Sequence, residues 1–181
     1  MTSLRERRRI LVVGSGGSGK STFARQLGEL TGLPVVHLDR HFWRAGWNAT
    51  PTDEWNVTVA RLAAAPEWIM DGNFGGSLAI RAPRCDAVVF FDFPRLTCLW
   101  GVLKRWFRYR GQTRPDMTEG CPEHMSLEFL LWIWRYPGRS RQRMLTGFAN
   151  AGPAVAVIHV TTRRDVADLL DAARRKLSNA A

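Results

Sequence analysis

Cysteine is scarce in this chain, and its positions suit neither cross-links nor zinc. Only three of the 181 residues are cysteine, at Cys85, Cys98 and Cys121. They are odd in number and widely spaced, and no C-x-x-C pair occurs, so neither a disulfide framework nor a zinc site is indicated. Free thiols of this kind are typical of a reducing compartment, and we expect a cytoplasmic protein.

Long hydrophobic runs are absent as well. The longest, Phe129-Leu130-Leu131-Trp132-Ile133-Trp134, is far shorter than the roughly 20 apolar residues that span a bilayer. The basic residues 5–9 precede only a short apolar stretch, which is too short for the apolar segment of a secretory signal. The sequence therefore predicts no membrane partner.

Lysine is rare although the chain is basic. The 26 Lys and Arg residues include only Lys20, Lys104 and Lys176, and the formal net charge is +10. Such a charge suits nucleic acid, but it equally suits a small polyanion such as ATP. Because the basic residues are spread from end to end, nucleic acid is a possible partner that the sequence does not favour.

A glycine-rich stretch near the start carries the strongest motif. Residues 14–21 read Gly-Ser-Gly-Gly-Ser-Gly-Lys-Ser and fit G-x-x-x-x-G-K-S/T at every fixed position. The glycines let backbone N–H groups turn toward phosphate oxygens, the lysine reaches the β- and γ-phosphates, and the last serine ligates Mg²⁺. The sequence therefore predicts ATP and Mg²⁺ as cofactors. The predicted nucleotide contacts are Gly14, Gly16, Gly17, Ser18, Gly19, Lys20, Ser21 and Thr22.

The flanking residues supply the context that this motif requires. Residues 10–13 form a short β-branched run typical of a buried strand, and residues 21–30 have helical apolar spacing that Gly32 ends. Further strands are predicted at 33–39, 68–72, 86–94 and 154–160, and further helices at 53–65, 95–110, 123–143 and 165–177, with Gly152-Pro153 as a break. This alternation predicts an α/β fold with a parallel five-stranded sheet and helices on both faces. We expect one domain over 9–177, a frayed basic arm over 1–8 and a lid region over about 105–137.

Two predicted strands end in an aspartate. In open parallel sheets ligands bind beyond the carboxyl ends of the strands, so Asp39 and Asp71 should lie near the phosphate loop. Asp39 is interpreted as a base for an acceptor hydroxyl or an outer partner of Mg²⁺, with a turn or cap residue as the alternative. Asp71 is predicted to order Mg²⁺ together with Ser21, and an Asp-Gly turn is its alternative.

Cations and aromatic rings alternate after the second strand. The segment Arg40 to Trp47 could stack a planar ring and hold an anion, or it could be a surface loop whose rings cap the core. Arg81 lies on a predicted helix further along. The predicted substrate contacts are Asp39, Arg40, Phe42, Trp43, Arg44 and Arg81.

A second basic segment follows the fourth predicted strand. The last turns of the helix over 95–110 collect cations, and the polar turn at 111–116 is suited to close over a triphosphate. The predicted catalytic residues are Lys20, Asp39, Arg105, Arg108 and Arg114.

Longer stretches give a more specific resemblance. They read GSGGSGKSTFARQL, HLDRHFWRAGW, WIMDGNFGG, RCDAVVFFDFPR, KRWFRYRGQTRPDMTEGCPE and EFLLWIWRYP. On these the chain resembles the adenylate-kinase-like small P-loop kinases, and within them the DNA topology modulation proteins. The resemblance implies a strand order of 2-3-1-4-5, an acceptor region after the second strand and an arginine-rich lid. Arg108 or Arg110, together with Arg114-Pro115, also resembles the lid of shikimate kinases, which implies that the first arginine lies against adenine and that Arg114 meets phosphate.

The predicted function is transfer of the γ-phosphoryl group of Mg·ATP to a small acceptor. The acceptor could be a hydroxyl, for which Asp39 is a base, or a monophosphate, for which Arg40, Arg44 or Arg81 matters more. Asn73-Phe74 replaces the residues that follow Asp-Gly in adenylate kinases, so the resemblance does not extend to AMP specificity. The alternative is a nucleotide-gated ATPase that binds DNA or a protein partner. No N-K-x-D signature of a GTPase is present.

Overall fold

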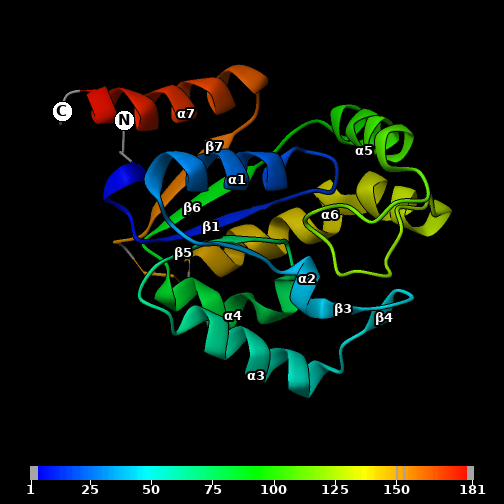
Figure 1. Ribbon diagram of the computed structural model, residues 1–181. Coiled ribbons are helices and arrows are strands. Elements are labelled where there is room, and N and C mark those ends of the chain that lie inside the picture. Colours follow the sequence, from blue (N-terminus) through cyan, green and yellow to red (C-terminus); the bar gives the residue numbers. More distant parts are fainter. Residues whose placement is uncertain (1–3, 150, 153, 179–181) are drawn as a thin grey trace.

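A five-stranded parallel sheet forms the centre of the computed structural model, which describes residues 4–149, 151–152 and 154–178 (Figure 1). The strand order is β2-β5-β1-β6-β7, and every neighbouring pair is parallel. Counted along the chain this is 2-3-1-4-5, so the predicted sheet and its order are confirmed. The strands are β1 (Arg9–Gly14), β2 (Val35–His37), β5 (Trp68–Asp71), β6 (Ala87–Phe91) and β7 (Ala156–Val160).

Helices cover both faces of the sheet (Figure 1). One face carries α1 (Lys20–Thr31), α5 (Arg95–Tyr109) and α7 (Arg163–Ser178), and the other carries α3 (Thr52–Ala63) and α4 (Leu78–Arg81). The helix α6 (Leu127–Ala149) places Ile133 in the first core and Phe148 in the second. Strands covered on both sides need apolar residues throughout, which explains the unbroken run at residues 10–13. None of the described helices is long and apolar enough to cross a bilayer.

The helix predicted over 123–143 begins and ends later than expected. Residues 122 and 123 form bridges with Thr113 and Arg110, so they belong to the loop before the helix. The helix starts at Leu127 and continues through Pro137 to Ala149. Residue 150 and Pro153, the proline of the predicted Gly152-Pro153 break, lie outside the described residues.

The basic arm predicted over residues 1–8 is ordered where the structure describes it. Leu4–Glu6 form a short 3₁₀ helix, η1, and Leu4 is only 4% exposed within the first core. The backbone N–H groups of Arg8 and Arg9 donate to the Asp86 carboxylate. Arg8 also pairs with Glu67, so the arm is held by apolar packing and by the carboxylates of Asp86 and Glu67; residues 1–3 lie outside the described part.

A small hairpin follows β2, and the sequence did not predict it. The N–H group of Leu38 donates to the carbonyl of Asp71, and the short helix α2 (Asp39–Phe42) then begins. The strands β3 (Trp43–Arg44) and β4 (Asn48–Ala49) pair antiparallel. Strands of two residues are too short to give a periodic pattern. Short 3₁₀ turns, η2 (Gly75–Ser77) and η3 (Ala82–Arg84), flank α4.

Candidate active site

The phosphate loop lies between β1 and α1 at the carboxyl edge of the sheet. A Cβ atom on Gly14 would lie 2.4 Å from the carbonyl oxygen of Phe91, and one on Gly17 would lie 2.1 Å from the carbonyl oxygen of Cys98. Both glycines also have positive φ angles, 141° and 74°. Close backbone contact and backbone conformation therefore both require glycine at these two positions.

The loop presents an anion-binding surface at the start of α1. Gly19 precedes the helix in a left-handed conformation, and no side chain caps the helix N-terminus. The Nζ of Lys20 donates to the Ser15 carbonyl at 3.0 Å, while the Ser15 hydroxyl oxygen is buried with no protein partner among the described residues. Uncapped N–H groups, the helix dipole and a lysine together favour a bound polyphosphate.

A carboxylate and a hydroxyl near this loop fit a magnesium ion held with a nucleotide. The register of β2 with β5 sets His37 opposite Asp71, and His37 Nδ1 lies 2.9 Å from Asp71 Oδ2. The other oxygen, Oδ1 of Asp71, is buried without a hydrogen-bond partner in the described chain. Hydroxyl and carboxylate oxygens suit Mg²⁺, which keeps several waters and takes the rest of its ligands from phosphates. Ser21 and Asp71 are therefore the residues that would hold it, and the described residues contain no cluster of three metal-ligating side chains.

Asp39 lies where four charged side chains act on it. It is the first residue of α2, just beyond the carboxyl end of β2, and it is half-buried. Burial raises its pKa above the ordinary value of 3.8, and Asp71 adds to the rise. Lys20 and Arg114 oppose the rise. The structure thus brings together the predicted base, the phosphate-loop lysine and a lid arginine.

A buried glutamate holds two of the predicted lid arginines. Glu123 is 4% exposed, and its carboxylate accepts from Arg105 Nε at 2.9 Å and forms an ion pair with Arg114 Nε at 2.7 Å. Arg114 Nη1 also donates to Asp116 at 2.8 Å. Burial lowers the pKa of Arg105, as does Arg114, and Glu123 opposes this. Since a buried cation is costly unless it is paired, Glu123 is what allows two arginines to share this site.

The lid loop, residues 110–126, lies against the β3–β4 hairpin (Figure 1). Gly46 N–H donates to the Gly120 carbonyl at 2.9 Å, and the Thr118 hydroxyl donates to the Arg40 carbonyl at 2.8 Å. The indole N–H of Trp47 donates to Pro122. Segments far apart in the sequence therefore close over the same edge of the sheet.

Two predicted nucleotide contacts are exposed arginines at the end of α5. Arg108 and Arg110 are exposed, and their guanidinium groups lie 5.5 and 5.0 Å from the ring centres of Tyr109 and Trp106. Cation–π contacts of this kind are weak at exposed sites. The backbone of Arg110 bridges to Glu123, and the assignment of both arginines to the nucleotide stays a prediction.

The aromatic segment after β2 serves the fold as well as the site. The Phe42 ring packs against Trp55 and Phe74, with ring centres 5.1 and 4.8 Å apart. Trp43 is half-buried, while Arg44 pairs with Glu54 on the surface. Arg40 is exposed and contributes its carbonyl to the lid contact. The interpretation of rings that cap the core is thus correct for Phe42.

Arg81 does not contact a substrate, which corrects the prediction. It is fully buried, and its guanidinium donates to the carbonyls of Gly72, Asn73 and Phe74 at 2.9–3.2 Å. Burial lowers its pKa to about 10. Its role is to hold the loop after β5 in place, and Phe74 there has a strained φ of 26°.

Three contributors to the site were not predicted from the sequence. Glu123 and Asp116 organise the lid arginines, and Arg163 donates to the Ser18 carbonyl of the phosphate loop at 3.1 Å. Arg163 is the first residue of α7 and follows β7 closely. Its place just after a parallel strand is the one sequence feature that could have indicated a role at this edge of the sheet. Glu123 ends the stretch at residues 104–123 that carries the family resemblance, but a single glutamate there has no distinguishing pattern.

Solved structures of small P-loop kinases have this fold. A shikimate kinase from Acinetobacter baumannii in complex with shikimate has a TM-score of 0.56 at 16% identity, covering 97% of this chain and 96% of its own. A shikimate kinase from Bacteroides thetaiotaomicron has a TM-score of 0.53 at 15% identity, with 95% and 99% covered. An unliganded sugar kinase from Janibacter sp. HTCC2649 reaches 0.50 at 18% identity, with 94% of each chain covered. No family model matches the chain, and no curated protein matches it.

Those values establish the fold alone. The chain is an α/β protein with the five-stranded sheet of small P-loop kinases. Membership of the DNA topology modulation proteins stays a prediction, since no family model matches.

Proposed function

We propose that this protein is an ATP-dependent kinase that phosphorylates a hydroxyl group of a small polar molecule. The observation that carries the proposal is the position of Asp39, which lies within the electrostatic reach of Lys20 and Arg114 and has a raised pKa. A carboxylate whose pKa lies closer to neutrality is a better general base for a hydroxyl. The neighbouring folds support the same chemistry, because shikimate and sugars are polyhydroxylated.

A monophosphate acceptor is less consistent with the surrounding charges. Lys20 and Arg114 act on Asp39, but both serve ATP in this proposal. Of the arginines that a monophosphate would need, Arg81 is buried on backbone carbonyls and Arg44 pairs with Glu54. The carboxylates of Asp71 and Asp116 also act on Asp39. Since like charges repel, this group of carboxylates favours a neutral hydroxyl over a second phosphate.

Each residue then has a defined part in the transfer. Asp39 accepts the hydroxyl proton while the acceptor oxygen bonds to the γ-phosphorus and the bond to the β-phosphate oxygen breaks, releasing ADP. Lys20 offsets charge on the phosphates, and Arg105 and Arg114 add positive charge from the lid. Bound Mg²⁺, held by Ser21 and ordered by Asp71, would neutralise charge on the polyphosphate.

The test compares acceptors and variants in a coupled assay of ADP release. We expect release with Mg·ATP to depend on a polyol, sugar or hydroxy acid, and to fall in Asp39→Asn but not in Arg40→Ala. Dependence on a nucleoside monophosphate, with Arg40→Ala more damaging than Asp39→Asn, would contradict the hydroxyl assignment. Release that needs DNA and no small acceptor would support the nucleotide-gated alternative instead.

A further inference from the structure

Two adjacent helices expose a row of large apolar side chains outside the candidate active site. On α5, Leu96 is 69% exposed, Trp100 57% and Phe107 67%. On α6, Leu127 is 78% exposed, Leu131 48% and Trp134 47%. We call these six residues the α5–α6 surface. Their spacing of three, four or seven residues places each set along one side of its helix.

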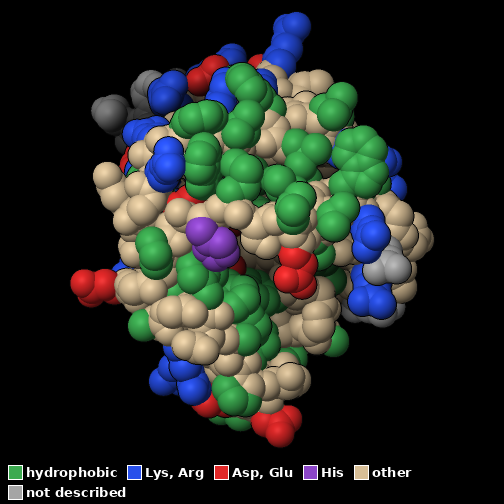
Figure 2. All heavy atoms as spheres, turned by 90° about the vertical axis from the view of Figure 1, so that its right-hand side faces the viewer, with side chains coloured by type: hydrophobic (Ala, Val, Ile, Leu, Met, Phe, Trp, Pro, Cys, Tyr) green, Lys and Arg blue, Asp and Glu red, His purple; other side chains and the backbone are tan. Residues whose placement is uncertain are grey.

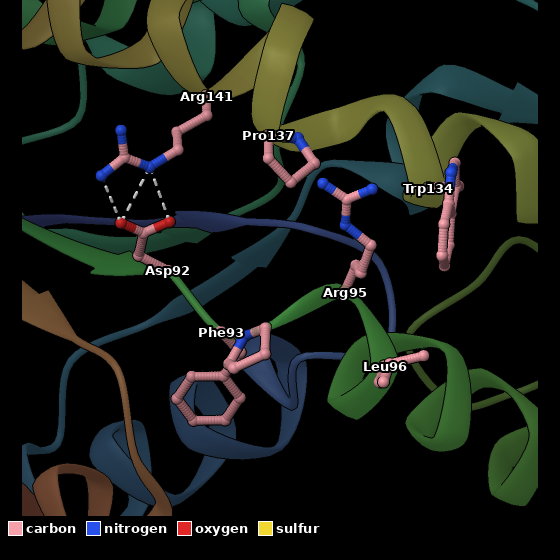
Figure 3. A pocket seen from close by; sticks show the side chains of 8 residues that line it. Asp92, Phe93, Arg95, Leu96, Trp134, Pro137 and Arg141 are labelled. Atoms are coloured by element: carbon pink, nitrogen blue, oxygen red, sulfur yellow. Dashed lines mark hydrogen bonds and ion pairs between the residues drawn. The ribbon is translucent and has the colours of Figure 1, made fainter.

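The two rows lie on neighbouring helices and meet at one end. The helices α5 and α6 pack against each other, and Leu96 and Trp134 line the same hollow at one end (Figure 3). There the guanidinium carbon of Arg95 lies 4.7 Å from the centre of the Trp134 ring. Figure 2 shows hydrophobic side chains gathered on the upper half of the face that is turned to the viewer. Exposed apolar patches of this kind mark interaction sites.

The charges around this surface are mostly positive: α6 contributes exposed Glu128, Asp92 in the shared hollow is paired with Arg141, and Arg105 is paired with Glu123. The helix α5 contains no Asp or Glu, and it carries Arg95, Lys104, Arg105 and Arg108. Lys104 lies 5.3 Å from the centre of the Trp100 ring. A partner with negative charge and an apolar interior would complement such a surface.

We propose that the α5–α6 surface docks on an anionic lipid bilayer. Exposed Trp, Phe and Leu side chains combined with Lys and Arg are typical of helices that lie in a membrane interface. The sequence predicted no membrane partner because no apolar run is long enough to span a bilayer. A contact with the bilayer surface does not require such a run. The proposal does not depend on the kinase assignment, because vesicle binding is measured without ATP.

The chemistry of the α5–α6 surface favours a lipid bilayer over single-stranded nucleic acid and over a second copy of the chain. Single-stranded nucleic acid stacks on open aromatic faces, but cations cover the rings of Trp100 and Trp134. Three of the six side chains are leucines, which cannot stack on bases. A second copy would bring two surfaces of positive charge together in a chain of net charge +10.

The test measures co-sedimentation of the full chain with vesicles. One set is phosphatidylcholine alone, and the other contains about one third phosphatidylserine. We expect binding to the anionic vesicles only, weakened by salt, and a drop of about tenfold in partitioning for the double variant Leu96→Ser/Phe107→Ser. Lys104→Glu should weaken binding through charge alone. The matched control is Val57→Ser on α3, because Val57 is 70% exposed outside this surface and should leave binding unchanged.

Several results would overturn the proposal. These are equal binding to neutral and anionic vesicles, no binding to either, or full binding by the double variant. Tighter binding of a single-stranded oligonucleotide that the double variant loses would assign the surface to nucleic acid. A dimer in sedimentation velocity that the double variant loses would assign it to self-association. Circular dichroism of each variant checks that the fold is kept.

Discussion

The phosphate loop and the lid reach the same edge of the sheet in different ways. The loop takes its geometry from consecutive residues, in which glycines allow close backbone contacts. The lid cluster joins Arg105, Arg114 and Glu123 with Asp39 from a distant segment. A site made of neighbouring residues can be recognised in the sequence as a motif. A site that folding assembles from distant residues can be predicted from the sequence only in part.

The two regions also differ in how firmly they are held. The loop is fixed by backbone contacts, since a Cβ atom on Gly101 of α5 would lie 2.0 Å from the Gly17 carbonyl oxygen. Arg163 holds its other side through Ser18. The lid is held by ion pairs and by four hydrogen bonds to the hairpin and to α2 before it, one of them from the Cys121 thiol to the Arg44 carbonyl. We infer that the loop is preorganised for phosphate and that the lid is the part that opens.

The largest effect is expected where the preorganised loop meets the phosphates. Lys20→Ala should lower kcat/KM by about 10²–10³-fold, the scale for losing one preorganised charge donor. Steady-state ADP release measures it. Lys104→Ala is the matched control, because Lys104 is an exposed lysine on α5 and should leave the rate unchanged. Equal rates for Lys20→Ala and the unmodified chain would contradict the assignment.

Asp39→Asn should lower turnover by roughly 10²-fold while Mg·ATP affinity stays near its original value. A base works only when ionised, and burial raises the pKa of Asp39. Activity of the unmodified chain should therefore fall as the pH drops through a value above 3.8, and Asp39→Asn should lack this acid limb. The control is Asp53→Asn, an exposed carboxylate on α3. An unchanged pH profile in Asp39→Asn would exclude Asp39 as the base.

Gly101→Ala tests the clamp on the phosphate loop. The added methyl group meets a backbone oxygen, which cannot rotate away, so we expect a loss of about 1–3 kcal/mol in the free energy of unfolding. Gly138→Ala on α6 is the matched control, since its Cβ would meet nothing within 4 Å and should stabilise the helix by up to about 1 kcal/mol. Chemical denaturation measures both. Equal changes in the free energy of unfolding for Gly101→Ala and Gly138→Ala would show that α5 does not clamp the loop.

Glu123→Gln should have the smallest effect, because it loosens the lid without removing a group that touches phosphate. We expect kcat to fall roughly tenfold, below the 10² that a 1 Å misplacement can cost. Glu119→Gln, an exposed residue of the same loop, is the control and should leave kcat unchanged. A loss of ATP affinity larger than the loss of kcat would instead make Glu123 a determinant of binding.

Much of the fold followed from the sequence, because strand and helix periods alternate over its length and apolar runs mark the buried strands. The hairpin at 43–49 did not, since its strands are too short for a pattern. Arg81 was misassigned because a buried arginine and a substrate-binding arginine look alike in sequence. Glu123 and Arg163 depend on contacts between distant segments, which no local pattern encodes.

The most direct test of the account is transfer of a labelled γ-phosphoryl group from ATP. Label should appear on a hydroxyl oxygen of a small polar acceptor, in step with ADP release, and Lys20→Ala should slow both by about 10²–10³-fold. Label that appears only in inorganic phosphate, whatever acceptor is present, would contradict it.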